Sequence, residues 1–355
     1  MNKNSTIFVA GHKGLVGSAI YDYLKNAGYK NIITRTSSKL DLRNQTKVQE
    51  FFEKHQPEYV FLAAAKVGGI QANNTYRADF ISDNLEIQNN VIRASFDNKV
   101  KKLLFLGSSC IYPKLADQPI KEESLLTGEL EYTNEPYAIA KIAGIKLIES
   151  LNIQYGTHYL SVMPTNLYGE NDNFDLEKSH VMPALIRKTV LCKMIEDNDY
   201  KSAAKNLGVD YESNEQLLNL VEKYGIYKKD GVVSLGVWGT GKPYREFMHV
   251  HDMAEACVYI MKNIDFEDLT KNKKEVKNTH INLGTGSDCT IKELAYKIKD
   301  IVGFKGEIIF DSTKPDGTPR KLLDVSKVHA LGWKHKIDID SGLKRTVSWY
   351  KEQCC

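Results

Sequence analysis

The sequence predicts an α/β protein whose main domain is a doubly wound parallel β-sheet. Short apolar runs rich in β-branched residues alternate with helical patterns from Thr6 to about residue 168, and repeated βα units imply parallel strands with helices on both faces. A glycine-rich turn follows the first apolar run, at the place where such sheets bind nucleotides. With 355 residues, 42% of them hydrophobic and 26% charged, the chain can form one large domain or two unequal ones.

The first strand and helix flank this glycine-rich turn. The strand expected at residues 6–10 is followed by Gly11, Gly14 and Gly17 and then by a helical pattern that reaches Ala27. Glycines allow a pyrophosphate to approach the backbone at the positive end of the helix, as in a Rossmann-type domain. The spacing is Gly-x-x-Gly-x-x-Gly rather than Gly-x-Gly-x-x-Gly, and a turn without a ligand is the alternative. The position between a first strand and a first helix favours dinucleotide binding.

The second strand, expected at residues 31–34, ends at a cation rather than an acid. An enzyme selective for NAD places a carboxylate there for the ribose hydroxyls, whereas this chain has Arg35. Arg35, together with Lys13, could contact a 2′-phosphate, which predicts NADP(H) as the cofactor. The alternative is that both are ordinary surface cations.

The alternation continues with further helices and strands. The strand at 102–106 runs into Ser108 and Cys110 at the carboxyl edge of the sheet, where ligands bind. A later strand at 160–163 leads into residues 164–169, which we expect to form the other wall of the cleft. We predict helices at 48–55, 80–96 and 250–263, and further strands at 59–62 and 280–283.

Tyr137 and Lys141 are four residues apart on an expected helix and therefore project from the same face. A neighbouring ammonium favours the phenolate and brings tyrosine toward the working range of an acid or base. Asn134 and Pro136 are typical of a helix start, so the pair lies where a new helix begins. A solvated surface pair is the alternative.

From about residue 171 the βα rhythm is lost, and we expect a smaller second domain of mixed α/β structure there. Residues 1–170, with later contributions from about 246–289, form the predicted NADP-binding domain; 171–245 and 290–355 form the predicted substrate domain. The substrate domain contains His180, a charged helical region from Cys192 to Lys229 and a cation-rich loop from Lys314 to Lys321. Such a loop could bind a diphosphate, although a solvated charge run is the commoner case.

Composition excludes several other functions. The net charge of +3 is small and the lysines are spread out, so a nucleic-acid or membrane partner is not expected. The sequence shows no spanning apolar run and no signal peptide, which predicts a cytoplasmic location. The six cysteines form no Cys-x-x-Cys pair, so no metal site is expected. The Cys354-Cys355 pair is interpreted as an exposed tail.

Taken together, the chain resembles the extended short-chain dehydrogenase/reductases and, among them, the GDP-L-fucose synthase family of epimerase-reductases. The resemblance runs nearly end to end and is most specific at residues 10–14, 63–70, 107–114, 134–141, 164–169 and 314–324. It implies a multifunctional enzyme of nucleotide-sugar biosynthesis, an oxidoreductase and isomerase. Its substrate would be a GDP-linked 4-keto-6-deoxy sugar, hexose or heptose. The enzyme would epimerise this sugar at C3 and C5 and then reduce it at C4 with NADPH. A homodimer is also expected.

The resemblance also implies roles for individual residues. Tyr137 would be the acid, Ser108 would hydrogen-bond the ketone, and Lys141 would lower the pKa of the tyrosine and hold the nicotinamide ribose. Cys110 and His180 would be the acid/base pair of epimerisation. The cofactor would contact Gly11, Lys13, Gly14, Leu15, Val16, Gly17, Arg35, Asp41, Leu42, Ala63, Ala64, Ala65, Tyr137, Lys141, Pro164, Asn166, Leu167 and His180. The substrate would contact Ser109, Cys110, Lys188, Trp238, Arg245, Arg320 and Lys321.

Two departures from the family leave the sugar open. The segment from Ile195 to Gly231 is longer than the family connection, and Lys188 stands where arginine is usual. We expect a helix over Ser213 to Tyr224, which would either cover the sugar or pack on the outer surface. The alternatives are a C4-reductase that acts on a GDP-4-keto-6-deoxy-heptose made by a separate epimerase and a non-enzymatic NADP-sensing protein. A 4,6-dehydratase is disfavoured, because Ser109-Cys110 replaces the acidic pair of those enzymes.

Overall fold

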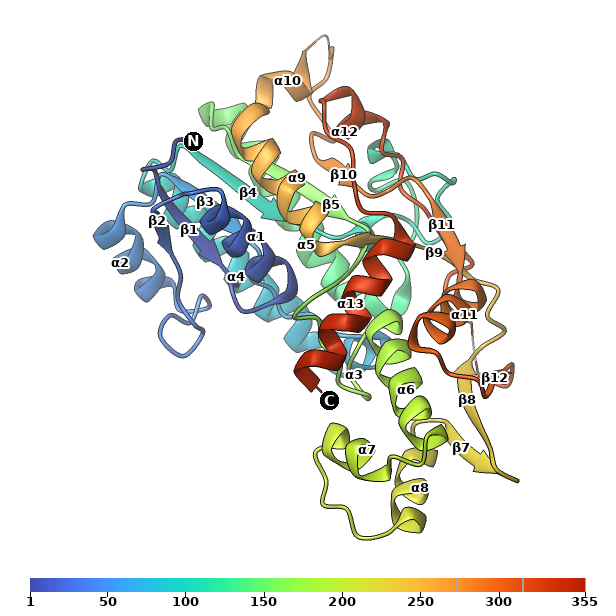
Figure 1. The fold of residues 1–355 in the computed structure, drawn as a ribbon. Helices are drawn as coiled ribbons and strands as arrows, with labels where there is room; N and C mark the ends of the chain where they lie inside the picture. Colours follow the sequence, from blue (N-terminus) through green and yellow to red (C-terminus); the bar gives the residue numbers. More distant parts are fainter. Residues whose placement is uncertain (272, 315, 355) are drawn as a thin grey trace. The chain divides into compact units, whose positions relative to one another are not determined.

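The computed structural model describes residues 1–271, 273–314 and 316–354 (Figure 1). Pro315, within the expected cation-rich loop, and Cys355, in the expected tail, lie outside the described residues. The chain divides into two compact units. Unit 1 comprises Met1–Leu167, Phe247–Gly286 and Leu322–Lys336, and unit 2 comprises Tyr168–Glu246, Ser287–Lys321 and Ile337–Cys355.

Unit 1 is built on a six-stranded parallel sheet in the order β10-β5-β4-β3-β1-β2. This confirms the predicted doubly wound α/β fold. The strand order reverses at β1, so the carboxyl ends of β1 and β3 form a switch point of the kind that binds ligands. The strands are β1 (Thr6–Ala10), β2 (Asn31–Ile33), β3 (Tyr59–Leu62), β4 (Lys102–Leu106), β5 (Leu160–Pro164) and β10 (Ile281–Leu283), and the short β6 (Asn166–Tyr168) follows β5.

Two layers of helices accompany this sheet (Figure 1). Helices α1 and α9 pack together, whereas α4 packs against both α2 and α5. The centre of the sheet is apolar, and Phe8, Phe61 and Phe105 are buried in one continuous core. The helices of unit 1 are α1 (Leu15–Asn26), α2 (Gln45–His55), α3 (Ile70–Thr75), α4 (Arg77–Asp97), α5 (Glu135–Tyr155), α9 (Val250–Asn263), α10 (Phe266–Thr270) and α12 (Ser326–Ala330).

Capping side chains set where some of the helices begin. Helix α2 begins three residues before the expected Val48, since the Asn44 side chain accepts a hydrogen bond from the Lys47 N–H at 3.0 Å. In unit 2 the helix Ile291–Val302 begins directly after Thr290, because Thr290 and Glu293 form a reciprocal capping box.

Unit 2 contains two small sheets and several helices. One sheet has the order β12-β8-β7, and in the other β9 pairs with β11 and β13. The strands are β7 (Ile226–Lys229), β8 (Val232–Trp238), β9 (Tyr244–His249), β11 (Asp288–Thr290), β12 (Glu307–Asp311) and β13 (Arg320–Lys321). The helices are α6 (Val181–Glu196), α7 (Tyr200–Leu207), α8 (Asn214–Glu222), α11 (Ile291–Val302) and α13 (Ile339–Cys354).

The predicted helical region from Cys192 to Lys229 is wrong at its end. Residues 226–229 form strand β7, which pairs antiparallel with β8. Asp230 and Gly231 both have positive φ and make the tight turn between these strands. The local pattern was dominated by lysines, and the strand pairing that decides the conformation is not visible in it.

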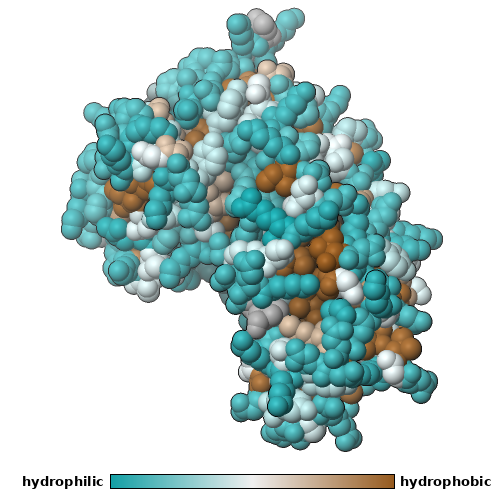
Figure 2. All heavy atoms as spheres, viewed as in Figure 1, coloured by the Kyte–Doolittle hydropathy of each residue, from teal (hydrophilic) through white to brown (hydrophobic). Residues whose placement is uncertain are grey.

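The surface is mainly hydrophilic, with apolar side chains in separate patches on the face seen in Figure 2. Single exposed apolar residues are normal in globular proteins. Among the described residues, none of the helices is long and apolar enough to span a membrane.

Candidate active site

The glycine-rich turn lies at the switch point of the unit 1 sheet. Gly11 has φ +88°, and a Cβ there would lie 2.7 Å from the Ala64 nitrogen, beyond the end of β3. A Cβ on Gly17 would lie 2.1 Å from the Gly11 carbonyl oxygen. These two glycines are therefore required for the packing of the turn between β1, β3 and α1.

Gly14 differs, because neither sterics nor backbone geometry within the chain requires a glycine there. Its φ is −82°, and a Cβ would meet only the Gly11 oxygen at an ordinary 3.5 Å. Gly14 caps α1 without a side chain, and the first turn of this 12-residue helix carries no acidic residue. The helix start is thus open to an anion, and the residues fit the pyrophosphate of a dinucleotide.

Arg35 is held beside the end of β2 by three neighbours. Its Nη1 donates to the Thr34 carbonyl at 2.8 Å, its Nη2 lies 3.1 Å from His55 Nε2, and its guanidinium lies over the Phe51 ring at 5.4 Å. In the described part of the chain Arg35 forms no ion pair with a carboxylate. Its charge is therefore available to an anionic ligand, as the 2′-phosphate prediction requires.

The other residues predicted to contact the cofactor lie along the carboxyl edge of the same sheet. Ala63, Ala64 and Ala65 follow β3, and the Ala63 N–H donates to the Ala10 carbonyl at 3.0 Å. Asp41 pairs with Arg43 at 2.9 Å, so its carboxylate is already neutralised. The remaining predicted contacts in unit 1 are Leu15 and Val16 on α1, exposed Lys13 in the turn, Leu42 packed on the core, and Pro164, Asn166 and Leu167 at β5 and β6.

Ser108 follows β4 and begins a short 3₁₀ turn, Ser109–Ile111. Its hydroxyl oxygen accepts a hydrogen bond from the Cys110 N–H at 3.3 Å, so the cap of this turn fixes the Ser108 side chain. Ser109 and Cys110 are buried in the turn. The sequence therefore places a hydroxyl at the carboxyl edge of the sheet because the strand ends and a capped turn begins there.

Lys141 on α5 is bound to the strand that leads to Ser108. Its ammonium donates to the Leu106 carbonyl at 2.8 Å and lies over the Phe105 ring at 4.6 Å. Gly144, one turn later, permits this approach, because a Cβ there would lie 2.7 Å from Phe105 Cζ. Helix α5 can thus pack closely on β4, and Lys141 is 3% exposed.

Tyr137 lies one helical turn before Lys141, whose Nζ is 5.7 Å from the centre of the tyrosine ring. Burial raises the pKa of Tyr137, and its electrostatic interaction with Cys110 raises it further. Burial lowers the pKa of Lys141 to about 8. The predicted effect of Lys141 on the tyrosine pKa is opposed by this desolvation, and the ammonium donates to the Leu106 carbonyl. Tyr137 therefore keeps its proton at neutral pH, as a proton donor must.

His180 precedes α6 of unit 2, and Lys188 lies within that helix. Partial burial lowers the pKa of the His180 imidazole, so the ring is neutral at pH 7. Burial also lowers the pKa of Lys188, and among the described residues its ammonium has neither a hydrogen-bond partner nor an ion pair. A half-buried cation of this kind is suited to an anionic ligand.

Trp238, Arg245, Arg320 and Lys321 lie near the ends of the small strands in unit 2. The Trp238 side chain at the end of β8 is 71% exposed, and Lys314 lies over its ring at 5.6 Å. Arg320 forms a two-point ion pair with Asp288, with nitrogen-to-oxygen distances of 2.7 and 3.1 Å. Sequence reasoning missed Asp288, because it lies 32 residues away and becomes a neighbour only through the pairing of β11 and β13 with β9.

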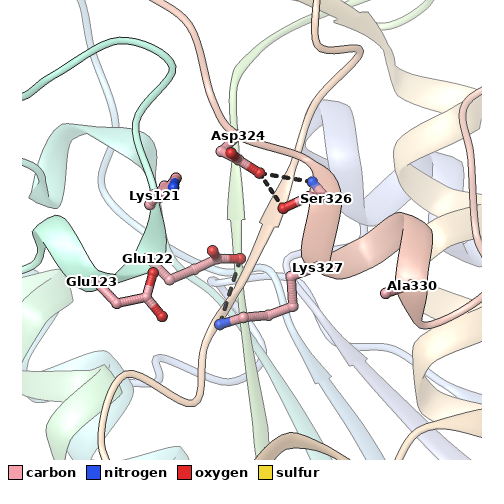
Figure 3. A pocket seen from close by; sticks show the side chains of 7 residues that line it. All are labelled: Lys121, Glu122, Glu123, Asp324, Ser326, Lys327 and Ala330. Carbon is pink, nitrogen blue, oxygen red and sulfur yellow. Dashed lines mark hydrogen bonds and ion pairs between the residues drawn. The ribbon is translucent and has the colours of Figure 1, made fainter.

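A surface cavity of about 420 Å³ in unit 1 is lined by none of the predicted site residues (Figure 3). Its charged walls compensate one another: Lys327 lies 3.6 Å from the buried Glu122 carboxylate and donates to the His280 carbonyl at 2.9 Å. Asp324 accepts hydrogen bonds from Ser326. These groups are therefore already paired with one another, and we assign no catalytic role to the cavity.

Comparison with known proteins identifies the family. The model of the NAD-dependent epimerase/dehydratase family matches residues 7–199 and 213–284. The chain belongs to this family. It is 49% identical to the GDP-L-fucose synthase of Escherichia coli K12 over 98% of this chain and 96% of that protein. The resemblance to GDP-L-fucose synthases is thereby confirmed.

Two solved structures from Campylobacter jejuni match this member of the family over 99% of both chains. One is a GDP-6-OMe-4-keto-L-xylo-heptose reductase, 48% identical with a TM-score of 0.94. The other is MlghC, a GDP-mannoheptose C4 reductase with NADP bound, 47% identical with a TM-score of 0.88.

Proposed function

We propose that the protein is an NADPH-dependent enzyme that reduces C4 of a GDP-4-keto-6-deoxy sugar, hexose or heptose, and epimerises C3 and C5. The observation that carries this proposal is full-length identity near one half with a GDP-L-fucose synthase and with GDP-heptose reductases, in a chain that has Ser108, Tyr137 and Lys141. The assignment of individual residues is part of the proposal.

The cofactor is NADP(H), bound at the switch point of the unit 1 sheet. The open start of α1 at Gly14 binds the pyrophosphate, and Arg35, which has no carboxylate partner among the described residues, binds the 2′-phosphate together with Lys13. The related C4 reductase solved with NADP supports this choice. NADPH supplies the hydride that reduces the carbonyl carbon.

Reduction of C4 requires a proton donor at the carbonyl oxygen. Ser108 and Tyr137 donate hydrogen bonds to this oxygen and polarise the carbonyl. As hydride reaches carbon, the Tyr137 proton moves to the oxygen and leaves a phenolate, which the Lys141 ammonium stabilises. Lys141 also hydrogen-bonds the nicotinamide ribose. The neutral state of Tyr137 before the reaction follows from its burial.

Epimerisation uses the same ketone before reduction. The C4 carbonyl acidifies the protons at C3 and C5, because the carbanion is stabilised as an enolate. Cys110 and His180 remove a proton from one face and return one to the other. The low pKa of His180 leaves its ring neutral and able to accept a proton at pH 7.

A C4-reductase without epimerase activity is the second candidate, and the similarity to proteins described as C4 or 4-keto-heptose reductases favours it. Incubation with a candidate GDP-4-keto-6-deoxy sugar and NADPH in heavy water separates the two candidates by NMR. Deuterium at C3 and C5 of the product supports epimerisation, and reduction without deuterium there supports the reductase alone. Absence of any NADPH oxidation would favour the NADP-sensing alternative.

We further propose that the protein acts in the cytoplasm as a homodimer with a GDP-linked keto-sugar as its substrate. Equilibrium sedimentation of the purified protein tests the dimer, because a single species at the monomer mass would contradict it.

A further inference from the structure

The loop from residue 312 to residue 319 connects the two small sheets of unit 2 and is fixed at both ends. Before the loop, β12 pairs with β8, and the Gly239 N–H donates to the Asp311 carbonyl at 2.9 Å. After the loop, β13 pairs with β9, and the Tyr244 N–H donates to the Pro319 carbonyl at 2.8 Å. Only the middle of the loop therefore needs a further restraint.

Asp316 supplies this restraint through Thr240. One carboxylate oxygen accepts the Thr240 N–H at 2.8 Å, and the other accepts the Thr240 hydroxyl at 2.7 Å. The same hydroxyl oxygen accepts the Lys242 N–H at 3.2 Å. The hydrogen bonds from Thr240 lower the pKa of Asp316, so the carboxylate is ionised at neutral pH. One side chain thus ties the loop to the turn between β8 and β9.

Two glycines show that the backbone accommodates this contact. A Cβ on Gly239, whose φ is +83°, would lie 2.3 Å from the Asp316 carboxylate oxygen. A Cβ on Gly317 would lie 2.9 Å from Arg245 Nη2. Any larger residue at either position would displace Asp316 or Arg245, so the close approach of loop, turn and guanidinium depends on both glycines.

Arg245 is anchored by this loop at one nitrogen. Its Nη1 donates to the Tyr244 carbonyl at 2.7 Å and to the Thr318 carbonyl at 2.6 Å. Within the described ranges its Nε and Nη2 have no acceptor, and no carboxylate forms an ion pair with it. The guanidinium is therefore oriented by backbone carbonyls and keeps two nitrogens for a ligand. A planar fork of this kind matches phosphate oxygens.

We propose that Asp316 is a positioning residue that, by fixing the loop on Thr240, orients Arg245 to bind the diphosphate of the substrate nucleotide. The inference rests on the proposed function, in which Arg245 contacts the GDP-sugar. Without the Asp316 contact, the Thr318 carbonyl and Gly317 are free to move, and Arg245 loses its fixed orientation. The guanidinium then has to be ordered when the ligand binds, which weakens binding.

Binding of GDP to the full-length protein, measured by titration calorimetry, tests this role. Asp316→Ala should weaken GDP binding about tenfold, a typical loss for a preorganised charged contact. Asp316→Asn should restore most of the affinity, because an amide can accept the Thr240 N–H and donate to the Thr240 hydroxyl. NADPH affinity should be unchanged in both variants.

A matched control and a double-mutant cycle make the test specific. Asp338, elsewhere in unit 2, likewise accepts hydrogen bonds from the Ser341 N–H at 2.9 Å and hydroxyl at 2.7 Å, and also from the Asp340 N–H at 3.0 Å. Asp338→Ala removes these hydrogen bonds and should leave GDP binding unchanged. In an Arg245→Ala background, Asp316→Ala should cause no further loss, because its effect is transmitted through Arg245.

Additive losses in that cycle, or unchanged GDP affinity in a folded Asp316→Ala variant, would overturn the inference while the proposed function stood. If the unmodified protein bound no GDP, the proposed function would fail and the inference with it.

Discussion

The phenol of Tyr137 keeps its proton because it is buried, and burial also lowers the pKa of Lys141 to about 8. Both side chains therefore depend on the close packing of α5 on β4, which Gly144 permits. At the scale of single residues, the site is set by desolvation more than by attraction between the two groups. Three predictions follow from individual side chains.

The first concerns the separation of reduction from epimerisation. Tyr137→Phe should abolish NADPH oxidation, because the carbonyl oxygen loses its proton donor, yet should leave deuterium exchange at C3 and C5. Cys110→Ala should lose this exchange and retain reduction of a substrate that needs no epimerisation. NMR in heavy water measures the exchange, and Tyr155→Phe on the exposed end of α5 serves as control. Loss of both activities in Tyr137→Phe would contradict separate roles.

The second concerns pH. Burial lowers the pKa of Lys141 to about 8, so its charged form is present below that pH and is lost as the pH rises through it. Since the ammonium stabilises the phenolate, kcat/KM for reduction should fall above about pH 8. A profile measured at saturating keto-sugar with varied NADPH tests this. A constant kcat/KM up to about pH 10 would show that the charge of Lys141 is not needed.

The third concerns cofactor choice. Arg35→Ala should raise the Michaelis constant for NADPH roughly tenfold or more, because a charged hydrogen bond is worth about 1.5–3 kcal/mol. The Michaelis constant for NADH should change little, because NADH has no 2′-phosphate. Lys39→Ala, which removes an exposed cation four residues away, provides the control. Equal use of NADH and NADPH by the unmodified protein would refute the role of Arg35.

At the scale of elements, the segment predicted to be an insertion adds β7 to the edge of the β12-β8-β7 sheet of unit 2. The predicted segment from Ile195 to Gly231 begins inside α6, where Ile195 is fully buried, and the additional elements are α7, α8 and β7. The predicted helix is confirmed as α8, with the Ser213 hydroxyl capping the Gln216 N–H at 3.2 Å. Its apolar face buries Leu217 and Val221, and α8 packs against β7.

Part of this segment nevertheless lies near a residue that is predicted to contact the substrate. The Gly236 N–H, two residues before Trp238, donates to the Gly225 carbonyl at 2.7 Å. A hydrogen bond with Tyr224 and the charge of Glu177, three residues before His180, raise the pKa of Lys223. The residues that follow α8 therefore lie beside the strand that ends at Trp238.

Replacing residues 199–224 by a short glycine-serine linker should change the ratio of kcat/KM values for hexose and heptose substrates. A lost sugar contact is worth about 1–3 kcal/mol of discrimination, a tenfold or larger change. NADPH affinity should be unchanged, because none of the residues predicted to contact the cofactor lies between 199 and 224. Circular dichroism establishes that the variant is folded. An unchanged ratio of kcat/KM values in a folded variant would mean that residues 199–224 only pack against the rest of unit 2 and do not affect the sugar.

At the scale of the whole molecule, the fold could be predicted because its signals are local. The strands at 6–10, 59–62 and 102–106 have the predicted bounds, since each is a short apolar run between turn residues. The candidate site could be predicted where its residues lie in one contiguous motif, as Tyr137 and Lys141 do. The partners that orient such side chains could not be predicted, because they become neighbours only in the folded chain. Examples are the pairs Leu106 with Lys141, Asp288 with Arg320, and Asp316 with Thr240.

The central claim is that hydride from NADPH is transferred to C4 of a GDP-linked keto-sugar. Its most direct test is incubation of the protein with GDP-4-keto-6-deoxymannose and NADPH deuterated at both C4 positions of the nicotinamide, followed by NMR and mass spectrometry of the product. The account predicts one deuterium per product molecule, located at C4 of the sugar. A reduced product without deuterium at C4, or no reduction of any GDP-4-keto-6-deoxy hexose or heptose, would contradict it.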